Sequence, residues 1–383
     1  MLLKGIEIYV FKLDDNGSFD AIGEINQFTS LIWPDKFNGY ATFELWAPIT
    51  PENKTLIKEG NILWCGGDNA AIIEIIQSSV NANGEKSYKI KGRTLEMYLT
   101  TRIVWGTYDC YNKFSSTAMY EIVNRNCINP TKLSRKIPFL ENAIDEQIGD
   151  KITYQKTGGE VYDALIGIAS ASDLGFDVLF RPKEKKLIFK VIEGVDRSIM
   201  PAYAGGINPV IFSTDLESIL TSSYYKNEQD VKSVALVAGE GLGASRKQIT
   251  SGDDTSTGFL RRELYIDARD LQSEILNDDG TTSTISEEEY NEMLDTRGSV
   301  KLSECVVVET FEAKVRDAGN TQYMYGVDYK KGDKVIIRDD ELGVQTIGKI
   351  TEINQNYGDK YELIITFGYE YPTLIQKIKQ QIL

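Results

Sequence analysis

The chain has 383 residues, a formal net charge of −15 and no histidine. The absence of histidine excludes Ser-His-Asp and Cys-His nucleophilic catalysis, and it excludes the histidine ligands of zinc hydrolases. A surface this acidic repels DNA and anionic membranes, so we expect no specific nucleic-acid binding and no membrane insertion.

The length predicts two to four domains, and 42% hydrophobic with 26% charged residues is typical of a globular protein. No apolar run is long enough to span a bilayer, and the N-terminal residues alternate in polarity instead of forming a signal-peptide core. We therefore expect a protein that is not secreted by a signal peptide and that is assembled in the cytoplasm. The cysteines form no CxxC pair, and we expect them to be reduced: Cys65, Cys110, Cys127 and Cys305.

Residues 1–105 show the pattern of short strands joined by tight turns. Asn38-Gly39 is a hairpin signal between two apolar alternating segments. Thr50 and Pro51 predict the cap and first residue of a short helix that ends near Gly60. The region predicts a small β-barrel or sandwich.

Residues 106–211 change to a mixed α+β pattern. Apolar residues recur at helical spacing in 115–127 and 159–174, and Gly175 stands where a left-handed C-cap is expected. A hairpin of strands 176–180 and 187–192 follows.

The stretch Val231–Ala238 (VKSVALVA) predicts a strand buried on both faces, which is typical of a barrel or a packed interface. A polar excursion, residues 244–299, then separates it from the next apolar strands. Within this excursion we expect a strand over 259–267 and a helix that starts with a capping box at Ser286 and is closed by Gly298. The final strands are expected at 305–311, 334–338, 344–353 and 361–367, followed by a helix over 373–383.

No catalytic, cofactor-binding or metal-binding residue is predicted. The motif Gly239-x-Gly241-x-Gly243 is not followed by a helix N-terminus, so it is interpreted as a turn and not as a phosphate loop. The carboxylate pairs lie in polar loops or at a helix start, where acids are solvated. Residues that could contact a subunit or partner are the aromatics of the first hairpins and the apolar stripe of the last helix: Trp33, Tyr40, Trp46, Leu374, Ile378 and Ile382.

Several stretches together resemble the siphophage tail-tip or baseplate hub family, in the same order along almost the whole chain. They are Ser30–Trp33 with Phe43–Leu45, Gly92–Leu95 with Leu99–Val104, Ala238–Gly241 with Arg246, Arg261–Ala268, and Gly332–Val335. The family is similar to the hub module of tail-associated lysins and to the hubs of contractile-phage baseplates.

The resemblance implies a mainly β fold with α+β insertions and two tail-tube-like β-barrel domains, the second discontinuous. The expected domains are a first barrel (1–105), an α+β domain (106–211), a second barrel (212–243 with 300–368), an inserted arm (244–299) and a C-terminal helix (369–383).

The resemblance also implies a homotrimer that adapts the sixfold tail tube to a threefold tip and forms part of the DNA conduit. Its expected partners are a distal tail ring or the tail tube, the tape-measure protein and downstream tip or receptor-binding proteins. It would reside in the virion, without enzymatic activity, and the acidic charge would suit a DNA-lining ring. Two alternatives stay open: a carbohydrate-binding protein or carboxylate-based cell-wall glycosidase, and the hub of a bacteriocin-like injection particle.

Overall fold

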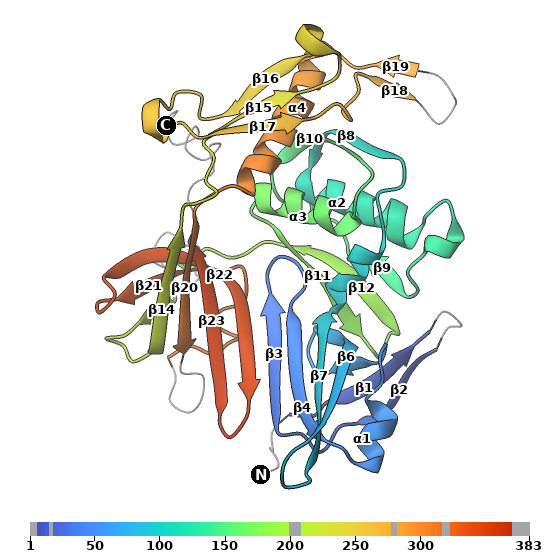
Figure 1. Ribbon diagram of the computed structural model, residues 1–383, viewed down its shortest axis with the longest axis vertical. Helices are drawn as coiled ribbons and strands as arrows, with labels where there is room; N and C mark the ends of the chain where they lie inside the picture. The colour runs from blue at the N-terminus through green and yellow to red at the C-terminus, as the bar shows by residue number, and fades with distance from the viewer. Residues whose placement is uncertain (1–5, 15–17, 199–207, 277–281, 316–321, 370–383) are drawn as a thin grey trace.

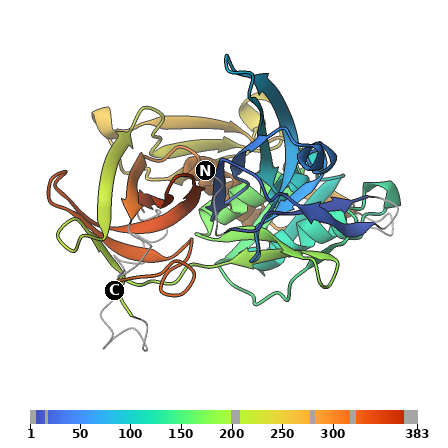
Figure 2. The same ribbon diagram turned by 90° about the horizontal axis from the view of Figure 1, so that it is seen from below.

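The computed structural model describes residues 6–14, 18–198, 208–276, 282–315 and 322–369. Two β-barrel-like units lie side by side, with an α+β domain above the first and an insertion at the top (Figure 1). This mainly β arrangement with α+β insertions confirms the predicted fold class. Figure 2, seen from below, shows the two barrels as neighbours.

The first barrel curls around a core that includes Leu31, Phe43, Leu45 and Ile90, all fully buried. Thr50 caps the short helix by accepting a hydrogen bond from the Asn53 amide, as its sequence predicts, although the helix ends at Leu56 and not near Gly60. Its elements are β1 (Tyr9–Leu13), β2 (Phe19–Glu24), β3 (Ser30–Lys36), β4 (Thr42–Pro48), α1 (Pro51–Leu56), β5 (Ile62–Trp64), β6 (Ala70–Val80) and β7 (Lys86–Thr94).

The α+β domain packs its helices against the first barrel through one large apolar core. Asp173, with φ of 57°, takes the left-handed conformation after α3, so the prediction of Gly175 as the cap is wrong. Gly175 instead begins a strand. The elements are β8 (Thr107–Phe114), α2 (Ser115–Val123), β9 (Leu140–Asn142), β10 (Lys151–Thr157), α3 (Val161–Ala171), β11 (Gly175–Arg181) and β12 (Lys186–Ile192).

The second barrel is discontinuous, with its own core that includes Phe212, Phe311 and Phe367. Its first strands, β13 and β14, pair with β21 and β20 from beyond the insertion. The elements are β13 (Ile211–Ser213), β14 (Ile219–Asn227), β20 (Val308–Val315), β21 (Lys334–Asp339), β22 (Val344–Tyr357) and β23 (Tyr361–Tyr369).

The insertion is larger than its sequence predicts, because the chain leaves the large sheet after Asn227 and re-enters it at Val308. The stretch 231–238 does not belong to the second barrel: its strand, β15, is the central strand of a separate three-stranded sheet with β16 and β17. The elements are β15 (Val234–Ala238), β16 (Gln248–Gly252), β17 (Glu263–Asp267), β18 (Glu274–Leu276), β19 (Thr282–Thr284) and α4 (Glu287–Ser303).

The apolar character of β15 comes from packing on α4, which covers one face of this sheet. The capping box of Ser286 and Glu289 starts α4 as predicted. Gly298 does not close the helix but lies inside it, where a Cβ would come within 2.4 Å of the Ser251 Cβ. The glycine therefore permits close packing of helix on sheet. The strand predicted over 259–267 begins only at Glu263.

Both barrels are built on the same five-strand unit. In the first, the strands lie in the order β3-β4-β7-β6-β5; in the second, the order is β14-β20-β23-β22-β21. In both units the first, second, fifth, fourth and third strands along the chain lie side by side in that order. All neighbouring pairs are antiparallel. The fourth strand in chain order carries a bulge in both units, at Ile73/Ile75 and at Ile350/Glu352. The chain thus contains an internal structural repeat.

Candidate functional site: the sheet shared by the two barrels

One long strand joins the barrels into a 13-stranded sheet. The first half of β22 pairs with β21 inside the second barrel, and the second half, from Glu352 to Tyr357, pairs antiparallel with β3 of the first barrel. The change of partner falls at the bulge, where the Phe37 amide donates to the Thr351 carbonyl at 2.9 Å. A bulge bends a strand and lets it leave one partner for another.

A buried cluster of charges holds this junction. Lys331, from the second barrel, forms ion pairs with Asp35 on β3 and, at 2.5 Å, with Asp177 on β11. Tyr325 donates to the other Asp35 oxygen at 2.5 Å, and buried Glu96 accepts the Val178 amide at 2.8 Å. Three parts of the chain therefore meet at one ammonium group.

Burial raises the pKa of Asp177, and the nearby carboxylates of Asp35 and Glu96 raise it further, so that it reaches about 7 in spite of Lys331. Burial likewise raises the pKa of Glu96. Burial alone would lower the pKa of Lys331, but the surrounding carboxylates raise it above its ordinary value. A charged lysine is the consistent state of this cluster at neutral pH, because the surrounding carboxylates offset the cost of burying its ammonium group.

Close backbone approach completes the junction around the ring of Phe37. Cβ atoms at Gly175 and Gly332 would lie 2.2 Å from the Phe37 carbonyl oxygen and 2.3 Å from its ring, respectively, so both positions need glycine. The Lys349 ammonium lies 4.2 Å from the ring centroid and forms an ion pair with Asp173. Such a packed, charge-paired contact fixes the two barrels relative to one another.

The face of the shared sheet that points away from the two cores is polar over the run formed by β20, β23, the part of β22 beyond its bulge, β3, β4, β7 and β6. The acidic side chains of this run are Glu44, Glu74, Glu312, Glu352 and Glu362. Its basic side chains are Lys36, Lys89, Lys91, Arg93 and Lys314. Five acids balance five bases, so the −15 charge of the chain resides elsewhere, and the expected acidic lining is not found on this face.

The balance hides a difference between the two halves. Within this run the first barrel contributes four bases and two acids, and the second contributes one base and three acids. Before the bulge, the same face of the second barrel carries three further bases, Lys334, Arg338 and Lys349. Two shallow hollows lie on the same face: one at the seam, lined in part by Ser30, Ile32 and Asn356, and one over the second barrel, lined in part by Glu312 and Glu362. The face is suited to contact with solvent or a passing polymer and not to enclosing a small substrate.

The predicted contact residues lie in different environments. Trp33 is 4% exposed and packs on Phe43, so its prediction as a surface contact is corrected to a core role. Tyr40 packs against Tyr162 of the α+β domain, with ring centroids 5.1 Å apart and the rings tilted by 34°. Trp46 is half-buried on the polar face. The remaining three, Leu374, Ile378 and Ile382, lie outside the described residues with the helix predicted over 373–383.

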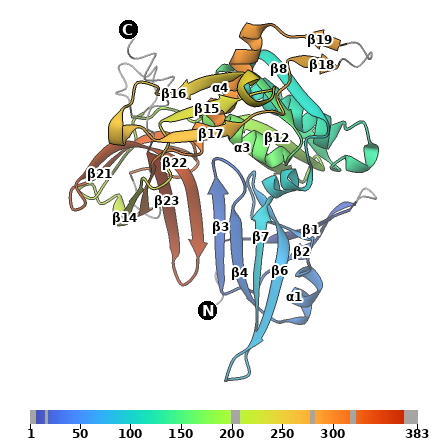
Figure 3. The ribbon, with the colours of Figure 1, turned by 45° about the horizontal axis from the view of Figure 1, so that its top comes forward.

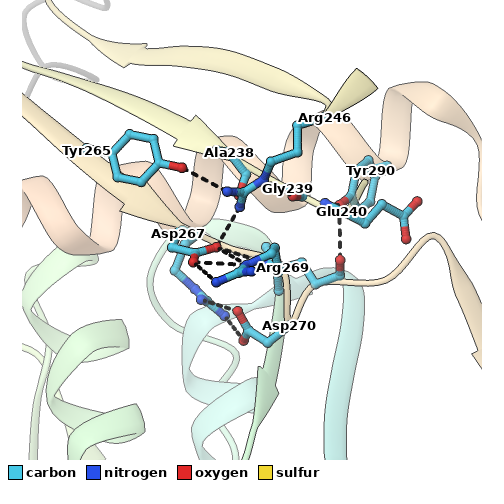
Figure 4. Close-up of polar contacts among 11 residues, drawn as sticks. Ala238, Gly239, Glu240, Arg246, Tyr265, Asp267, Arg269, Asp270 and Tyr290 are labelled. Carbon is cyan, nitrogen blue, oxygen red and sulfur yellow. Dashed lines mark hydrogen bonds and ion pairs between the residues drawn. The ribbon is translucent and has the colours of Figure 1, made fainter. Parts of the chain in front are cut away.

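The glycine motif is explained by a structural role in the insertion (Figure 4). Arg246, after the turn, donates to the carbonyls of Ala238 and Gly239, to the Tyr265 hydroxyl at 2.8 Å and to Asp267 at 2.5 Å. One guanidinium therefore ties the end of β15 to the end of β17. Its donors are used within the fold.

The first glycine of the motif also leaves room for a tyrosine. A Cβ on Gly239 would lie 2.4 Å from the Tyr290 hydroxyl oxygen. That hydroxyl accepts the Glu240 amide at 2.8 Å and donates to the Leu271 carbonyl at 3.0 Å. The motif is thus a turn that packs against α4. This confirms its interpretation from sequence as a turn.

Sequence reasoning missed the junction itself. The strand predicted over 344–353 is longer in the structure: the polar residues 354–357 (NQNY) continue β22 and pair with β3. The Lys331 cluster was not predicted either, because Asp35 and Lys331 are 296 residues apart in the sequence. Of the patterns in the sequence, only the stretch Gly332–Val335, one of those that carry the family resemblance, lies beside Lys331.

The sequence matches the family described as Siphovirus ReqiPepy6 Gp37-like protein over residues 7–369. The chain belongs to this siphovirus tail protein family. No curated protein sequence matches it. Being a phage tail protein, it is a structural component of the virion.

Solved structures with the same fold are also tail proteins. The chain is similar to the tail protein from Neisseria meningitidis MC58, with 13% identity, a TM-score of 0.54, and coverage of 97% of this chain and 98% of that chain. It is similar to the 43 kDa tail protein of prophage MuSo2 from Shewanella oneidensis, with 12% identity, a TM-score of 0.50, and coverage of 94% and 97%. Within the described ranges, none of the helices has both the length and the apolar character needed to cross a membrane.

Proposed function

We propose that three copies of this tail protein form a hub ring at the tail tip or baseplate. The observation that carries the proposal is the internal repeat: one chain holds two copies of the same five-strand unit, joined edge to edge by β22 and β3. Three such chains would present six equivalent units, which matches the sixfold symmetry of a tail tube on one side and a threefold tip on the other. The chain would then act as an adaptor without catalytic duty.

The shared polar face supplies the conduit in this proposal. It runs without interruption over β14, β20, β23, β22, β3, β4, β7 and β6. A face with balanced charge neither holds nor strongly repels a polyanion, because the attraction of its bases is offset by its acids. DNA could therefore slide past it.

The partners of such a hub would be the tail tube or a distal tail ring above and tip or receptor-binding proteins below, with the tape-measure protein in the lumen. The insertion, which projects from one end of the barrels in Figure 1, is available for one of these contacts. Trp46 and Tyr40 remain candidate contact residues within the ring.

The test is the molar mass of the purified full chain by size exclusion with light scattering at micromolar concentration. A mass of three times 43.0 kDa supports the hub. A chain that stays monomeric even with its neighbouring tail proteins present overturns it. Release of sugar from peptidoglycan by the isolated chain would favour the glycosidase alternative instead.

A further inference from the structure

The run of strands from β14 to β6 in the shared sheet ends in two strand edges, one on β6 and one on β14. Beyond its bulge, β6 pairs with β7 on one side, and its partner on the other side, β5, reaches only Ala70–Ile72 of it. β14 is a terminal strand of the 13-stranded sheet among the described residues, with β20 beside it. Long strand edges of this kind are templates for pairing with another chain.

The internal repeat identifies these two edges as equivalents of the junction between the barrels. β6 occupies the place of β22, and β14 occupies the place of β3. Within the chain, β22 beyond its bulge is covered by β3. The corresponding contact for β6 would need a β14, and the chain's own β14 lies at the far end of the sheet. Figure 3 shows the β6–β7 and β22–β23 hairpins pointing the same way.

The strand registers align the two units residue by residue. Ile90 faces Leu45 and Ile76, and Ile365 faces Ala313 and Ile353, at the same places in each unit. The bulges then set Ile76 equivalent to Ile353, and Gln77 equivalent to Asn354. On the other edge, the β3–β4 and β14–β20 registers make Pro34 equivalent to Tyr225.

The hydrogen-bond phase agrees with this alignment. In the β6–β7 hairpin the Asn81 amide donates to the Glu85 carbonyl at 3.0 Å, and alternation then turns the amide of Ser78 away from β7. In the β22–β23 hairpin the Gly358 amide donates to Lys360 at 3.3 Å, which turns the amide of Gln355, the equivalent of Ser78, toward β3. β6 therefore presents the same donors to its outer edge that β22 presents to β3.

We propose that residues Ile75–Val80 of β6 in one copy pair antiparallel with Ser222–Asn227 of β14 in the next copy, with Gln77 opposite Tyr225. This inference rests on the proposed hub ring and names the strands that close it. The contact is head to tail, because different edges meet, and it repeats the β22–β3 junction from copy to copy.

Exposed apolar side chains and charge both fit this pairing. In the single chain Ile75 is 50% exposed, Val80 63% and Tyr225 56%, and all three lie on the two edges. Val80 is equivalent to Tyr357, which packs against the core of the first barrel within the chain. On the polar face of the strands next to the two edges, β6 and β7 carry three bases and one acid, and β20 and β23 carry two acids and one base, so unlike charges meet across the contact.

A disulfide tests the register. Because Pro34 has no amide hydrogen, the Asn354–Pro34 pair is a non-hydrogen-bonded pair with close Cα atoms, and the equivalent Gln77–Tyr225 pair has the geometry that a disulfide needs. The full chain with Gln77→Cys and Tyr225→Cys, oxidised at micromolar concentration, should run as covalently linked copies on a non-reducing gel. The matched control is Gln77→Cys with Thr221→Cys, which lies on the same face of β14 but four residues away.

The outcomes separate this inference from the hub itself. Linking of the first pair and not of the control supports the register. A trimer by light scattering without linking of the first pair, or with equal linking of both pairs, overturns the register and leaves the hub standing. A chain that does not associate at all overturns both. The wild-type chain, with its four natural cysteines, gives the background.

A second variant tests the edge without new cysteines. Ser78→Pro removes an amide that points away from β7, so the hairpin keeps its own hydrogen bonds while the outer edge loses one and gains a steric block. We expect the dissociation constant of the assembly to rise at least about tenfold, with the unfolding midpoint of the dilute chain unchanged. An unchanged dissociation constant would count against the edge pairing.

Discussion

The two barrels share a strand order and differ in what covers the outer edge of their bulged strand. In the second barrel, β22 is covered by β3 of the same chain, and Ile353 beyond the bulge is fully buried. In the first barrel, β6 beyond its bulge has no such cover among the described residues, and the equivalent Ile76 is only half-buried. Among the described residues, the β22–β3 contact is therefore formed, and the equivalent edge of β6 is not covered.

In the proposed ring, this difference between the outer edges of β22 and β6 gives the two edges different partners. An interface formed once inside the chain needs no partner, so it folds with the subunit. In the proposed ring, the same interface is formed again between unlike edges of neighbouring copies, and head-to-tail contacts close into rings when the rotation permits. On this proposal the repeat supplies both the fold of the subunit and the contact used in its assembly.

The largest effect is expected from breaking the cluster that fixes the complete contact. Lys331→Met leaves the carboxylates of Asp35 and Asp177 buried without their cation, which should cost about 3–5 kcal/mol of unfolding free energy. Urea denaturation of the purified chain measures it. The control is Lys330→Met, an exposed neighbour, expected to change stability by less than about 0.5 kcal/mol. Equal losses in the two variants would show that the cluster does not hold the junction.

The comparison of the barrels is sharpened by truncating equivalent residues. Ile353→Ala should destabilise the single chain by about 2–5 kcal/mol, because the side chain is fully buried. Ile76→Ala should cost the dilute chain less than Ile353→Ala, and it should additionally weaken assembly, because in the proposed ring its outer side packs against the next copy. Denaturation at low concentration and light scattering across a dilution series separate the two effects. If Ile76→Ala left assembly untouched, the equivalence of the two edges would be lost.

Much of this arrangement could be predicted from local sequence, and the informative errors lie at the contacts between distant segments. Thr50-Pro51 and the capping box at Ser286 set helix starts through residues within a few positions of one another, and both predictions are confirmed. The continuation of β22 through NQNY could not be predicted, because Asn354 and Asn356 disfavour strands and the segment owes its conformation to pairing with β3.

The misplacement of residues 231–238 has a similar cause. The apolar pattern of a strand predicts that the strand is buried, but it does not identify the sheet to which the strand belongs. Its true partners, β16 and β17, are short and partly exposed, so they gave weaker signals than the barrel strands. The resemblance to a known family supplied the barrels, while the boundary of the insertion required the strand pairing.

A pH-dependent effect should distinguish the buried junction from the exposed face. Asp177 has an ordinary pKa of 3.8 and a pKa of about 7 in the fold, so the folded state binds more protons than the unfolded state between these values. Its contribution to stability is therefore full below about pH 4 and is lost as the pH rises through 7. Asp177→Asn removes this dependence.

The measurement is the unfolding free energy of wild type and Asp177→Asn at several pH values from 4 to 8. The stability of the wild type relative to the variant should fall by more than about 1 kcal/mol as the pH rises across this interval. Asp150→Asn, another acid of the α+β domain, serves as the comparison. A difference between wild type and Asp177→Asn that is constant with pH would place the ionised carboxylate in the junction throughout.

The smallest effect, of opposite sign with pH, belongs to the polar face of the first barrel. Burial alone would raise the pKa of Glu44, but hydrogen bonds from Trp46, Lys91 and Lys89 lower it from 4.5 to about 2. A lowered carboxylate pKa stabilises the fold above about pH 4.5, and this contribution is lost as the pH falls toward 2. Because the ion pairs are partly exposed, Glu44→Gln should cost about 1 kcal/mol or less at pH 7.

The variant should also flatten the acid limb of the stability curve below pH 4.5, and a carboxyl NMR titration of the wild type should show Glu44 ionised at pH 3.5. A Glu44 that titrates near 4.5 would mean that Lys89 and Lys91 are not held in place on this face. The two lysines would then be free to contact a passing polyanion, and the offset of bases by neighbouring acids that is proposed for the conduit would fail on the first barrel.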